Sequence, residues 1–463
     1  MYSQRYSSSS SDPSPLAQPL HFEHADRSAS NRFLKGATTE HLASWHPNDP
    51  AQSGIPTPGL VNVYRRWGEG GFGQIVTGNI MIDPTHLEER GNMIIPGDAD
   101  FRGERFDAFR QLGAAGRAQG SLMVGQISHP GRLAHSRLQH DPVSASSVPV
   151  RGNLEIFKSK ELLDAIFTYA PPHAASLDEV ATIIDGFAHA AEFLDRAGWD
   201  GIQLQAAHGF LLSQFLSSVS NQREDNYGGS LENRIRLIIE IAAEIRKRVS
   251  PNFILGIKIN SVDFQSGFSA EDAQTLCKSL ETAHFDYVEL SGGSVETNYA
   301  EVSGSVDGKR ESTKARESFF LNFADQIVAP LSSVKAYVTG GFKTVGGMVD
   351  ALRSVDGVGL VRAACQEPCL PREILAGNVT GAINRLLDDH HWGVTTVAAG
   401  AQIRQLSKDL EPFDQSIQAN ADSFLADFDI FLASFGKEAD ENNYGFMDLS
   451  QPAQPYGVQI TAP

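Results

Sequence analysis

The sequence predicts an α/β protein that forms one (β/α)8 TIM barrel with loop insertions and a C-terminal extension. Short apolar runs alternate with amphipathic helical stretches from Asn31 to about Leu375, and eight such runs are separated by seven helices. Alternation of this kind is typical of parallel strands that are buried on both faces, and eight of them suit a closed barrel better than an open sheet. The length of 463 residues fits one such barrel with additions.

The predicted strands are short runs rich in β-branched residues. In chain order they cover residues 32–36, 74–82, 121–128, 201–205, 254–260, 287–291, 336–340 and 358–362. The stretches between them keep their apolar residues on one helical face, which predicts helices that pack on the sheet. These helices cover residues 58–67, 104–118, 177–197, 231–249, 270–283, 319–329 and 345–355.

The chain divides into three parts around this repeat. Residues 1–19 are rich in Ser, Pro and Gln and are predicted to be a disordered arm, residues 20–377 form the barrel, and residues 378–463 form a helical extension with a polar tail. Two insertions, residues 140–172 and 292–318, follow the third and sixth strands. Because both leave from the carboxyl ends of strands, we expect them to overhang the face where barrel enzymes keep their active sites.

Charge and cysteine content narrow the class of protein. A formal net charge of −18 argues against nucleic acid and anionic membranes as partners, and a small-molecule partner is expected instead. No apolar run approaches the roughly 20 residues that cross a bilayer. The three cysteines have neither a disulfide pattern nor a metal-binding spacing, so we expect no metal site and a reducing, cytoplasmic location. The oligomeric state is left open.

The stretch from Gly201 to Arg234 carries the strongest indication of function. It begins as an apolar run of strand length and ends in a helix that Ser230 opens. Between them lie polar residues that a packed core does not need, namely Gln205, His208, Asn221, Arg223, Asp225 and Tyr227. Polar side chains at the carboxyl end of a barrel strand predict a catalytic site.

This stretch resembles the signature of the old yellow enzyme family, the NADH:flavin oxidoreductases. The segment HGFLLSQFLS is followed by YGGSLENR. Five further motifs occur in the same order as in the family: VTGN, GQISHPGR, GIKIN, VTGGF and VGLVR. The long C-terminal extension is similar to that of fungal-type members. The resemblance implies an FMN-dependent NAD(P)H oxidoreductase of the ene-reductase type, with NADH or NADPH as co-substrate. Such an enzyme transfers hydride from reduced flavin to an activated alkene, an α,β-unsaturated carbonyl.

The resemblance also assigns residues to the flavin ring. Gln126 matches the glutamine at the pyrimidine edge, and Lys258 matches the cation that stabilises reduced flavin. The other matching positions are Ala37, Thr38 and Thr39 after the first strand and Gly78 on the second, where a glycine lets the backbone approach the ring. From the residues alone, Gln126 could instead be a polar core group and Lys258 an ion-pair partner inside the barrel.

The phosphate of FMN is assigned to the loops after the seventh and eighth strands. The matching residues are Gly340, Gly341, Val361 and Arg362. Independently of the resemblance, barrels often bind phosphate in these two loops, and an arginine adds paired charge.

Substrate binding is assigned to four residues. Gln205 and His208 match the catalytic pair that hydrogen-bonds the substrate oxygen, but the family usually carries His with His or His with Asn. A glutamine donates hydrogen bonds without becoming cationic, so oxyanion stabilisation would rest mainly on His208. Phe210 stands where the family usually has a Tyr that protonates the alkene, and His41 follows the first-strand loop.

The phenylalanine leaves several functions open. Loss of general-acid help costs about 10²–10⁴-fold in the protonation step, so slow reduction is one expectation. The alternative is a flavin-dependent isomerase or a specialised biosynthetic enzyme, and a third is a flavin-binding scaffold with little turnover.

Overall fold

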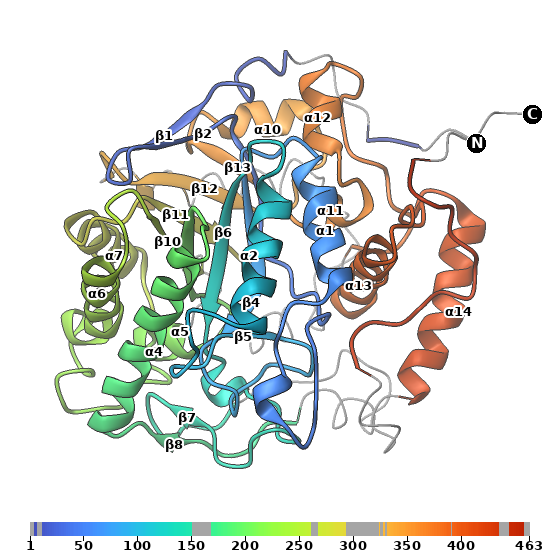
Figure 1. The fold of residues 1–463 in the computed structure, drawn as a ribbon. Helices are drawn as coiled ribbons and strands as arrows, with labels where there is room; N and C mark the ends of the chain where they lie inside the picture. Colours follow the sequence, from blue (N-terminus) through green and yellow to red (C-terminus); the bar gives the residue numbers. More distant parts are fainter. Residues whose placement is uncertain are drawn as a thin grey trace, which may run out of the picture.

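The computed structural model describes residues 4–6, 12–150, 168–260, 267–292, 324, 327–328, 331–389, 391–434 and 444–457. Eight parallel strands close into a barrel, because the first of them pairs with both its successor and the last strand (Figure 1). The strands are β3 (Phe33–Lys35), β4 (Gln74–Met81), β6 (Leu122–Ser128), β9 (Gly201–Ala206), β10 (Ile254–Asn260), β11 (Tyr287–Ser291), β12 (Lys335–Thr339) and β13 (Gly357–Leu360). The predicted barrel is therefore confirmed, with strand ends shifted by two residues at most.

Helices cover the outside of the barrel. They are α1 (Pro58–Gly68), α2 (Glu104–Arg117), α4 (Leu177–Arg196), α6 (Leu231–Arg248), α7 (Ala270–Thr282) and α10 (Val345–Ala351). Ser176 and Glu179 form a capping box that begins α4, and the Ser230 hydroxyl accepts from the N–H of Asn233 to begin α6, as predicted. The predicted helix at 319–329 lies mostly outside the described residues, as do large parts of the insertions at 140–172 and 292–318.

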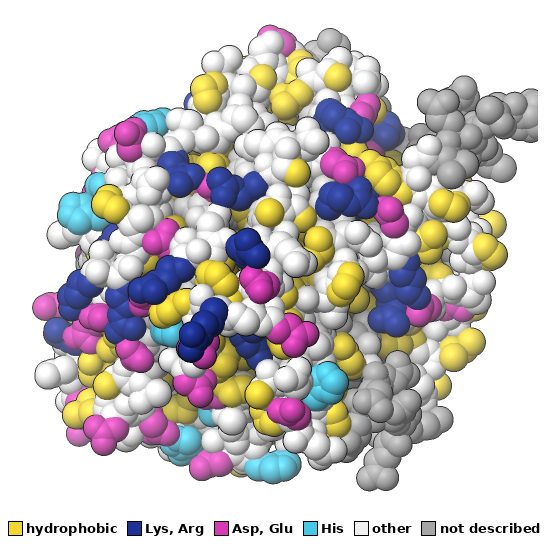
Figure 2. Space-filling view, in the orientation of Figure 1, with side chains coloured by type: hydrophobic (Ala, Val, Ile, Leu, Met, Phe, Trp, Pro, Cys, Tyr) yellow, Lys and Arg dark blue, Asp and Glu magenta, His cyan; other side chains and the backbone are white. Residues whose placement is uncertain are grey.

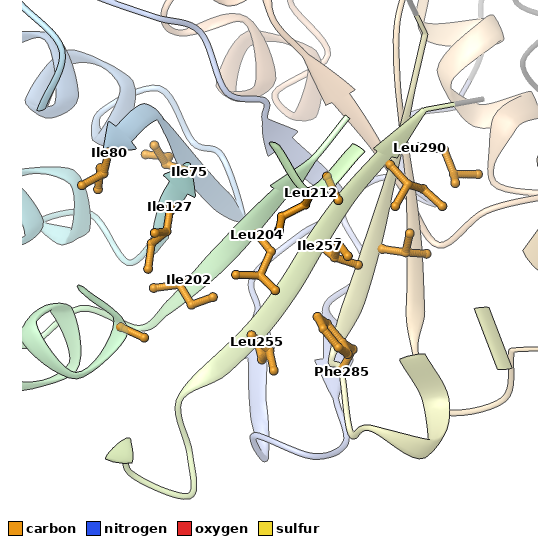
Figure 3. Packing of buried hydrophobic residues seen from close by; sticks show 14 of the residues in the cluster. Ile75, Ile80, Ile127, Ile202, Leu204, Leu212, Leu255, Ile257, Phe285 and Leu290 are labelled. Carbon is orange, nitrogen blue, oxygen red and sulfur yellow. The ribbon is translucent and has the colours of Figure 1, made fainter. Parts of the chain in front are cut away.

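The alternation of side chains along each strand builds two apolar layers. Residues pointing outward, such as Ile202 and Leu204 on β9 and Leu255 on β10, pack in the larger cluster under the helices (Figure 3). Residues near the amino ends of the strands form a second, inner cluster, which includes Val124, Ile254, Tyr287 and Tyr337. The inner layer therefore fills the half of the barrel near the amino ends of the strands, and polar side chains occupy the half near the carboxyl ends.

A short hairpin closes the end of the barrel at which the strands begin. Its strands are β1 (Leu20–Phe22) and β2 (Arg27–Ala29), and the buried side chains of Leu20 and Phe22 belong to the inner cluster. Asp286, at the base of β11, accepts the N–H of Ala25 at 2.8 Å and so fixes the hairpin turn to the barrel. The sequence did not predict this hairpin, because its strands have only three residues each.

The N-terminal arm differs from the disordered segment that composition predicted. Leu16 is fully buried in the outer cluster, and its carbonyl accepts the N–H of Arg32 at 2.9 Å. Arg5 lies 2.5 Å from the carboxylate of Glu367. The buried side chain of Leu16 and the ion pair of Arg5 thus help to hold the described part of the arm on the barrel. The amino-acid composition of a segment does not predict single contacts of this kind.

The C-terminal extension packs beside the barrel. Helix α13 (Trp392–Ser407) lies against α1 and α11 (Arg362–Gln366), and α14 (Gln418–Ser434) packs on α13 (Figure 1). In the predicted helical extension, the described residues between 378 and 391 are irregular, and the first helix begins at Trp392. Within the described residues, no helix is both long and apolar enough to cross a membrane. On the face drawn in Figure 2, Lys and Arg side chains are interspersed with Asp and Glu.

Candidate active site at the carboxyl end of the barrel

Four buried side chains near the carboxyl ends of the strands form a chain that is joined by two hydrogen bonds and one ion pair. The Gln126 amide donates to Gln203 Oε1 at 2.6 Å, and the Gln203 amide donates to Glu289 Oε2 at 2.7 Å. Glu289 Oε1 lies 3.1 Å from Lys258 Nζ. All four residues are at most 3% exposed. The structure therefore joins the two residues assigned to the flavin's pyrimidine edge through two residues that the sequence did not single out.

The register of the strands produces this chain. Gln126 is the neighbour of Gln203 across β6 and β9, and Lys258 is the neighbour of Glu289 across β10 and β11. Because the strands are parallel, residues at the same height on neighbouring strands point into the barrel together. Lys258 therefore has an ion-pair partner in the protein, as the alternative interpretation of this residue expected.

His208 lies on the turn that follows β9, close to this chain. Its backbone is left-handed (φ 59°), and its N–H donates to Asn260 Oδ1 at 2.9 Å. Its ring Nε2 lies 3.2 Å from the hydroxyl of Ser291. Gln205, 3% exposed, turns its carbonyl oxygen back to the N–H of Ala207 at 3.3 Å. The ends of three neighbouring strands thus fix the imidazole.

The imidazole is held neutral. Burial, with a smaller effect from the charge of Lys258, lowers the pKa of His208 to about 3. A neutral imidazole has one N–H to donate and one lone pair to accept, so it can stabilise developing negative charge as a hydrogen-bond donor.

Phe210 and His41 are held by packing. Phe210 is 7% exposed and belongs to an apolar cluster with Met81, Leu87, Ile94 and Leu133, so it supplies a wall and no proton. His41 has a left-handed backbone (φ 53°), and its ring stacks on Phe446 with centroids 5.2 Å apart. The partner of His41 therefore comes from the C-terminal extension.

The C-terminal segment continues across the loop after β3. The Tyr444 hydroxyl donates to the carbonyl of Ala43 at 2.8 Å. A side chain at Gly400 of α13 would collide with the ring of Phe446, so this glycine makes room for the aromatic side chain. Residues 444–447, called here the C-terminal strap, thus fix the outer side of the loop that carries the residues assigned to the flavin.

In that loop, Ala37 packs against the inner apolar cluster and the Thr38 hydroxyl points to the carbonyl of Gly36 at 3.4 Å. The Thr39 hydroxyl lies 3.3 Å from Glu88 Oε2, which also accepts from the amide of Asn79 at 2.8 Å. Glu88, a carboxylate on the loop after β4, is a further polar member of this region that sequence reasoning missed.

The glycine at position 78 has a structural role different from the expected one. The space that a side chain would need there is filled by the Glu40 carboxylate and the carbonyl of Thr38. Glu40 accepts the N–H of Gly78 at 2.9 Å and also contacts the hydroxyl of Tyr64. The missing side chain of Gly78 therefore makes room for the first-strand loop, and its assignment to the flavin ring stays a prediction.

The residues assigned to phosphate lie together beside the ends of β12 and β13. Gly341 has φ 69°, and the space where its Cβ would stand is open. Three cations converge on one carboxylate: Asp389 lies 2.6 Å from Lys343, 2.8 Å from Arg385 and 3.8 Å from Arg362. Three positive charges against one negative charge, next to an open glycine turn, suit a phosphate dianion.

Val361 connects this region with the first strand. A Cβ on Gly36 would lie 2.9 Å from Val361 Cγ2 and 3.4 Å from Glu289 Oε1. Gly36 after β3, Glu289 on β11 and Val361 after β13 therefore border one space, which is closed to a larger side chain at position 36.

A triad of Asp83, His86 and His129 presents three potential metal-ligand atoms within 4.8 Å of one another. His86 Nε2 accepts the N–H of Val143 at 3.1 Å, and His129 Nδ1 accepts the N–H of Gly131 at 3.0 Å. The remaining nitrogen of each ring then carries its proton toward Asp83, 2.8 Å from His86 Nδ1. Although burial opposes it, these hydrogen bonds hold the pKa of Asp83 well below its usual range. The triad is a hydrogen-bonded cluster whose ring lone pairs are already used.

The polar residues of the YGGSLENR region have structural partners. Arg223 pairs with Asp225 at 2.6 Å, the Tyr227 hydroxyl donates to Glu240 at 2.7 Å, and Arg234 donates to the carbonyl of Leu216 at 2.8 Å. The Asn221 amide donates to the carbonyls of Phe215 and Tyr227. These residues shape the loop before α6.

A closed eight-stranded barrel with amides, a lysine and an imidazole gathered at its carboxyl end defines the class of (β/α)8-barrel enzymes. The chain belongs to the NADH:flavin oxidoreductase / NADH oxidase family, which matches residues 15–350. This confirms the resemblance to the old yellow enzyme family.

Similar proteins include two fungal relatives, one of which matches over nearly the full length of both chains. The NADH-dependent flavin oxidoreductase nadA of Aspergillus parasiticus is 48% identical over 453 residues, which cover 97% of this chain and 98% of that protein. The NADH-dependent flavin oxidoreductase iccE of Talaromyces variabilis is 32% identical over 74% of this chain and 83% of its own. The structure of morphinone reductase shares the fold with a TM-score of 0.62 at 21% identity, over 80% of this chain and 91% of that one.

Several site residues escaped sequence reasoning, namely Gln203, Glu289, Asn260, Ser291 and Glu88. Gln203 and Glu289 stand inside apolar strands, where a polar residue must find a buried partner, and Asn260 and Ser291 end strands β10 and β11. The position of these four residues, inside or at the end of an apolar strand, was therefore the feature of the sequence that could have identified them. Glu88 lies in a loop and gave no such signal.

Proposed function

We propose that this protein is an FMN-dependent oxidoreductase that uses NADH to reduce the activated C=C bond of an α,β-unsaturated carbonyl compound. When bound, FMN would take up the electrons of the nicotinamide and pass them to the alkene. The observation that carries the proposal is that Gln126, Lys258 and His208 lie at the carboxyl ends of neighbouring strands of the barrel, in a chain of this family. Full-length similarity to a relative named as NADH-dependent favours NADH as the reductant.

The residues present fit this cofactor at both of its ends. The amide of Gln126 and the ammonium of Lys258 would hold the pyrimidine edge, where reduction adds negative charge. Gly341 and Arg362, beside Lys343, would hold the phosphate. The loop of Ala37, Thr38 and Thr39 would border the ring.

His208 would bind the carbonyl oxygen of the substrate. Its neutral ring, fixed by Asn260 and Ser291, can donate one hydrogen bond as that oxygen gains negative charge. Gln205 would help to orient the substrate through its amide, and Phe210 would supply an apolar wall. The substrate is a small molecule.

Phe210 favours a second candidate function, a flavin-dependent isomerase or another specialised biosynthetic enzyme. A phenyl ring has no proton to give, so an alkene that has accepted hydride lacks its usual acid at this position. If that hydride returned to the cofactor after a rotation about the former double bond, the net result would be isomerisation.

One experiment separates these functions. The purified protein is saturated with FMN, and its absorbance spectrum is followed under anaerobic conditions before and after NADH is added. We expect NADH to bleach the flavin and an enone to restore its colour with formation of the saturated product. Rearranged product without net NADH consumption would favour the isomerase, and a flavin that NADH leaves coloured would contradict both enzymes and indicate a scaffold.

A further inference from the structure

The buried chain from Gln126 to Lys258 has a direction that Glu289 determines. An ionised carboxylate only accepts hydrogen bonds, whereas an amide has one accepting and one donating end. Because Glu289 accepts from the Gln203 amide, the Gln203 oxygen faces Gln126 and accepts from it. One N–H of the Gln126 amide is thereby committed to Gln203, and the direction of this bond leaves the Gln126 oxygen as an acceptor for a ligand. An acceptor oxygen suits the N–H of a flavin's pyrimidine ring.

Glu289 also acts on the charge of the region. Its Oε1 lies 3.1 Å from Lys258 Nζ, and both side chains are almost completely buried. Solvent screens buried charges weakly, so the carboxylate offsets much of the positive potential that Lys258 would otherwise supply. A ligand that becomes negative next to Lys258 is stabilised less than it would be by the lysine alone.

We propose that Glu289 is a positioning residue for the flavin, which sets the amide direction of Gln126 through Gln203 and lowers the reduction potential of the bound cofactor by offsetting Lys258. This inference rests on the proposed function. A lower potential makes the reduced cofactor a stronger electron donor toward an alkene, and it makes reduction by NADH less favourable.

The test compares Glu289→Gln with wild type, with FMN bound to both. The substitution removes the negative charge with little change in volume. We expect the ratio of reduced to oxidised flavin at a fixed solution potential to rise about tenfold, which is a shift of about 30 mV toward positive potential for a two-electron couple. Glu281→Gln, a carboxylate-to-amide change on α7 that accepts from Ser332 and Ser333, serves as the matched control and leaves the potential unchanged. A wild-type potential in Glu289→Gln would overturn the inference.

A second variant covers the case in which Glu289→Gln does not fold because Lys258 loses its buried partner. Gln203→Met keeps both charges and the volume but breaks the link to Gln126. We expect the dissociation constant of FMN, measured by the quenching of its fluorescence, to rise about tenfold. An unchanged dissociation constant would contradict the positioning role. If wild-type protein binds no FMN, the proposed function itself fails, whereas normal wild-type binding with unaffected variants overturns only the role of Glu289.

Discussion

The backbone N–H of His208 donates to Oδ1 of Asn260 at 2.9 Å, and this bond joins the turn after β9 to the end of β10. The backbone of His208 lies in the left-handed region (φ 59°), which residues other than glycine adopt rarely. A hydrogen bond from the neighbouring strand therefore stabilises a strained backbone at the residue that is assigned to the substrate oxygen, as is common at functional sites.

Asn260→Ala should loosen this turn. Leaving a buried N–H without its acceptor costs about 1–3 kcal/mol, so we expect kcat/KM for alkene reduction to fall about 10- to 100-fold. Ser291→Ala, which removes only the partner of the ring nitrogen, should have a smaller effect. Steady-state kinetics with one enone compare the two variants, and equal activity of Asn260→Ala and wild type would exclude a role for this bond.

Phe210→Tyr should restore a proton donor. If reduction is limited by protonation, the rate of product formation rises, by up to about 10²-fold, whereas bleaching of the flavin by NADH stays the same. The measurement is a comparison of the two half-reactions by rapid mixing. Phe210→Leu keeps an apolar wall without a hydroxyl and serves as the control. No gain in Phe210→Tyr would show that position 210 does not supply the proton.

The stability of the fold should decrease in mild acid. Burial, together with the neighbouring His86, lowers the pKa of His129 to about 4 against the opposing effect of Asp83. Between pH 6.5 and 4 the unfolded chain therefore binds more protons than the native chain, and the free energy of unfolding falls by up to about 1.4 kcal/mol per pH unit for this one group. The stabilisation is complete above pH 6.5, and it is lost as the pH falls through 4.

Denaturant titrations at several pH values test this dependence. His129→Asn keeps an acceptor for the N–H of Gly131 but does not titrate, so the slope between pH 6.5 and 4 should become smaller. His140→Asn, at an exposed position, is the control. An unchanged slope in His129→Asn would mean that this histidine does not carry the effect.

Phe446→Ala should weaken the loop that carries Thr39. The variant removes the ring that stacks on His41 and leaves space beside Gly400. Phe446 is half-buried, so its loss should cost less than the about 3–5 kcal/mol typical of a fully buried aromatic ring, and we expect FMN to bind up to about tenfold more weakly. Tyr456→Phe, in the same terminal segment but next to Arg66 of α1 and to Glu69, which follows this helix, should leave FMN binding unchanged. The measurement is fluorescence titration, and wild-type affinity in Phe446→Ala would exclude the strap as a support of the loop.

The sequence was sufficient for the architecture of the barrel and for the positions of the assigned residues along it. Strands such as β10 and β11 were located to the residue, because short apolar runs bounded by turn residues are typical of buried strands. Pairings between strands depend on register, however, and register is a property of the folded sheet. The partners of Gln126 and Lys258 could therefore not be named beforehand.

Contacts between distant segments were equally hidden. His41 and Phe446 are more than 400 positions apart, and composition describes the terminal segment only as polar and rich in proline. Leu16 was missed for the same reason, since one leucine in a polar arm carries no periodic signal. The local pattern of residues predicts helices and strands well. It does not predict which single side chain packs against a segment that is distant in the sequence.

The hairpin of β1 and β2 has a kinetic consequence. Among the described residues, the side chains of Leu20 and Phe22 fill the barrel where its strands begin, which leaves the carboxyl ends of the strands as the approach to its polar half. In the proposed reaction, oxidised nicotinamide would then have to leave this end of the barrel before an alkene binds there. Double-reciprocal plots at several NADH concentrations should accordingly give parallel lines.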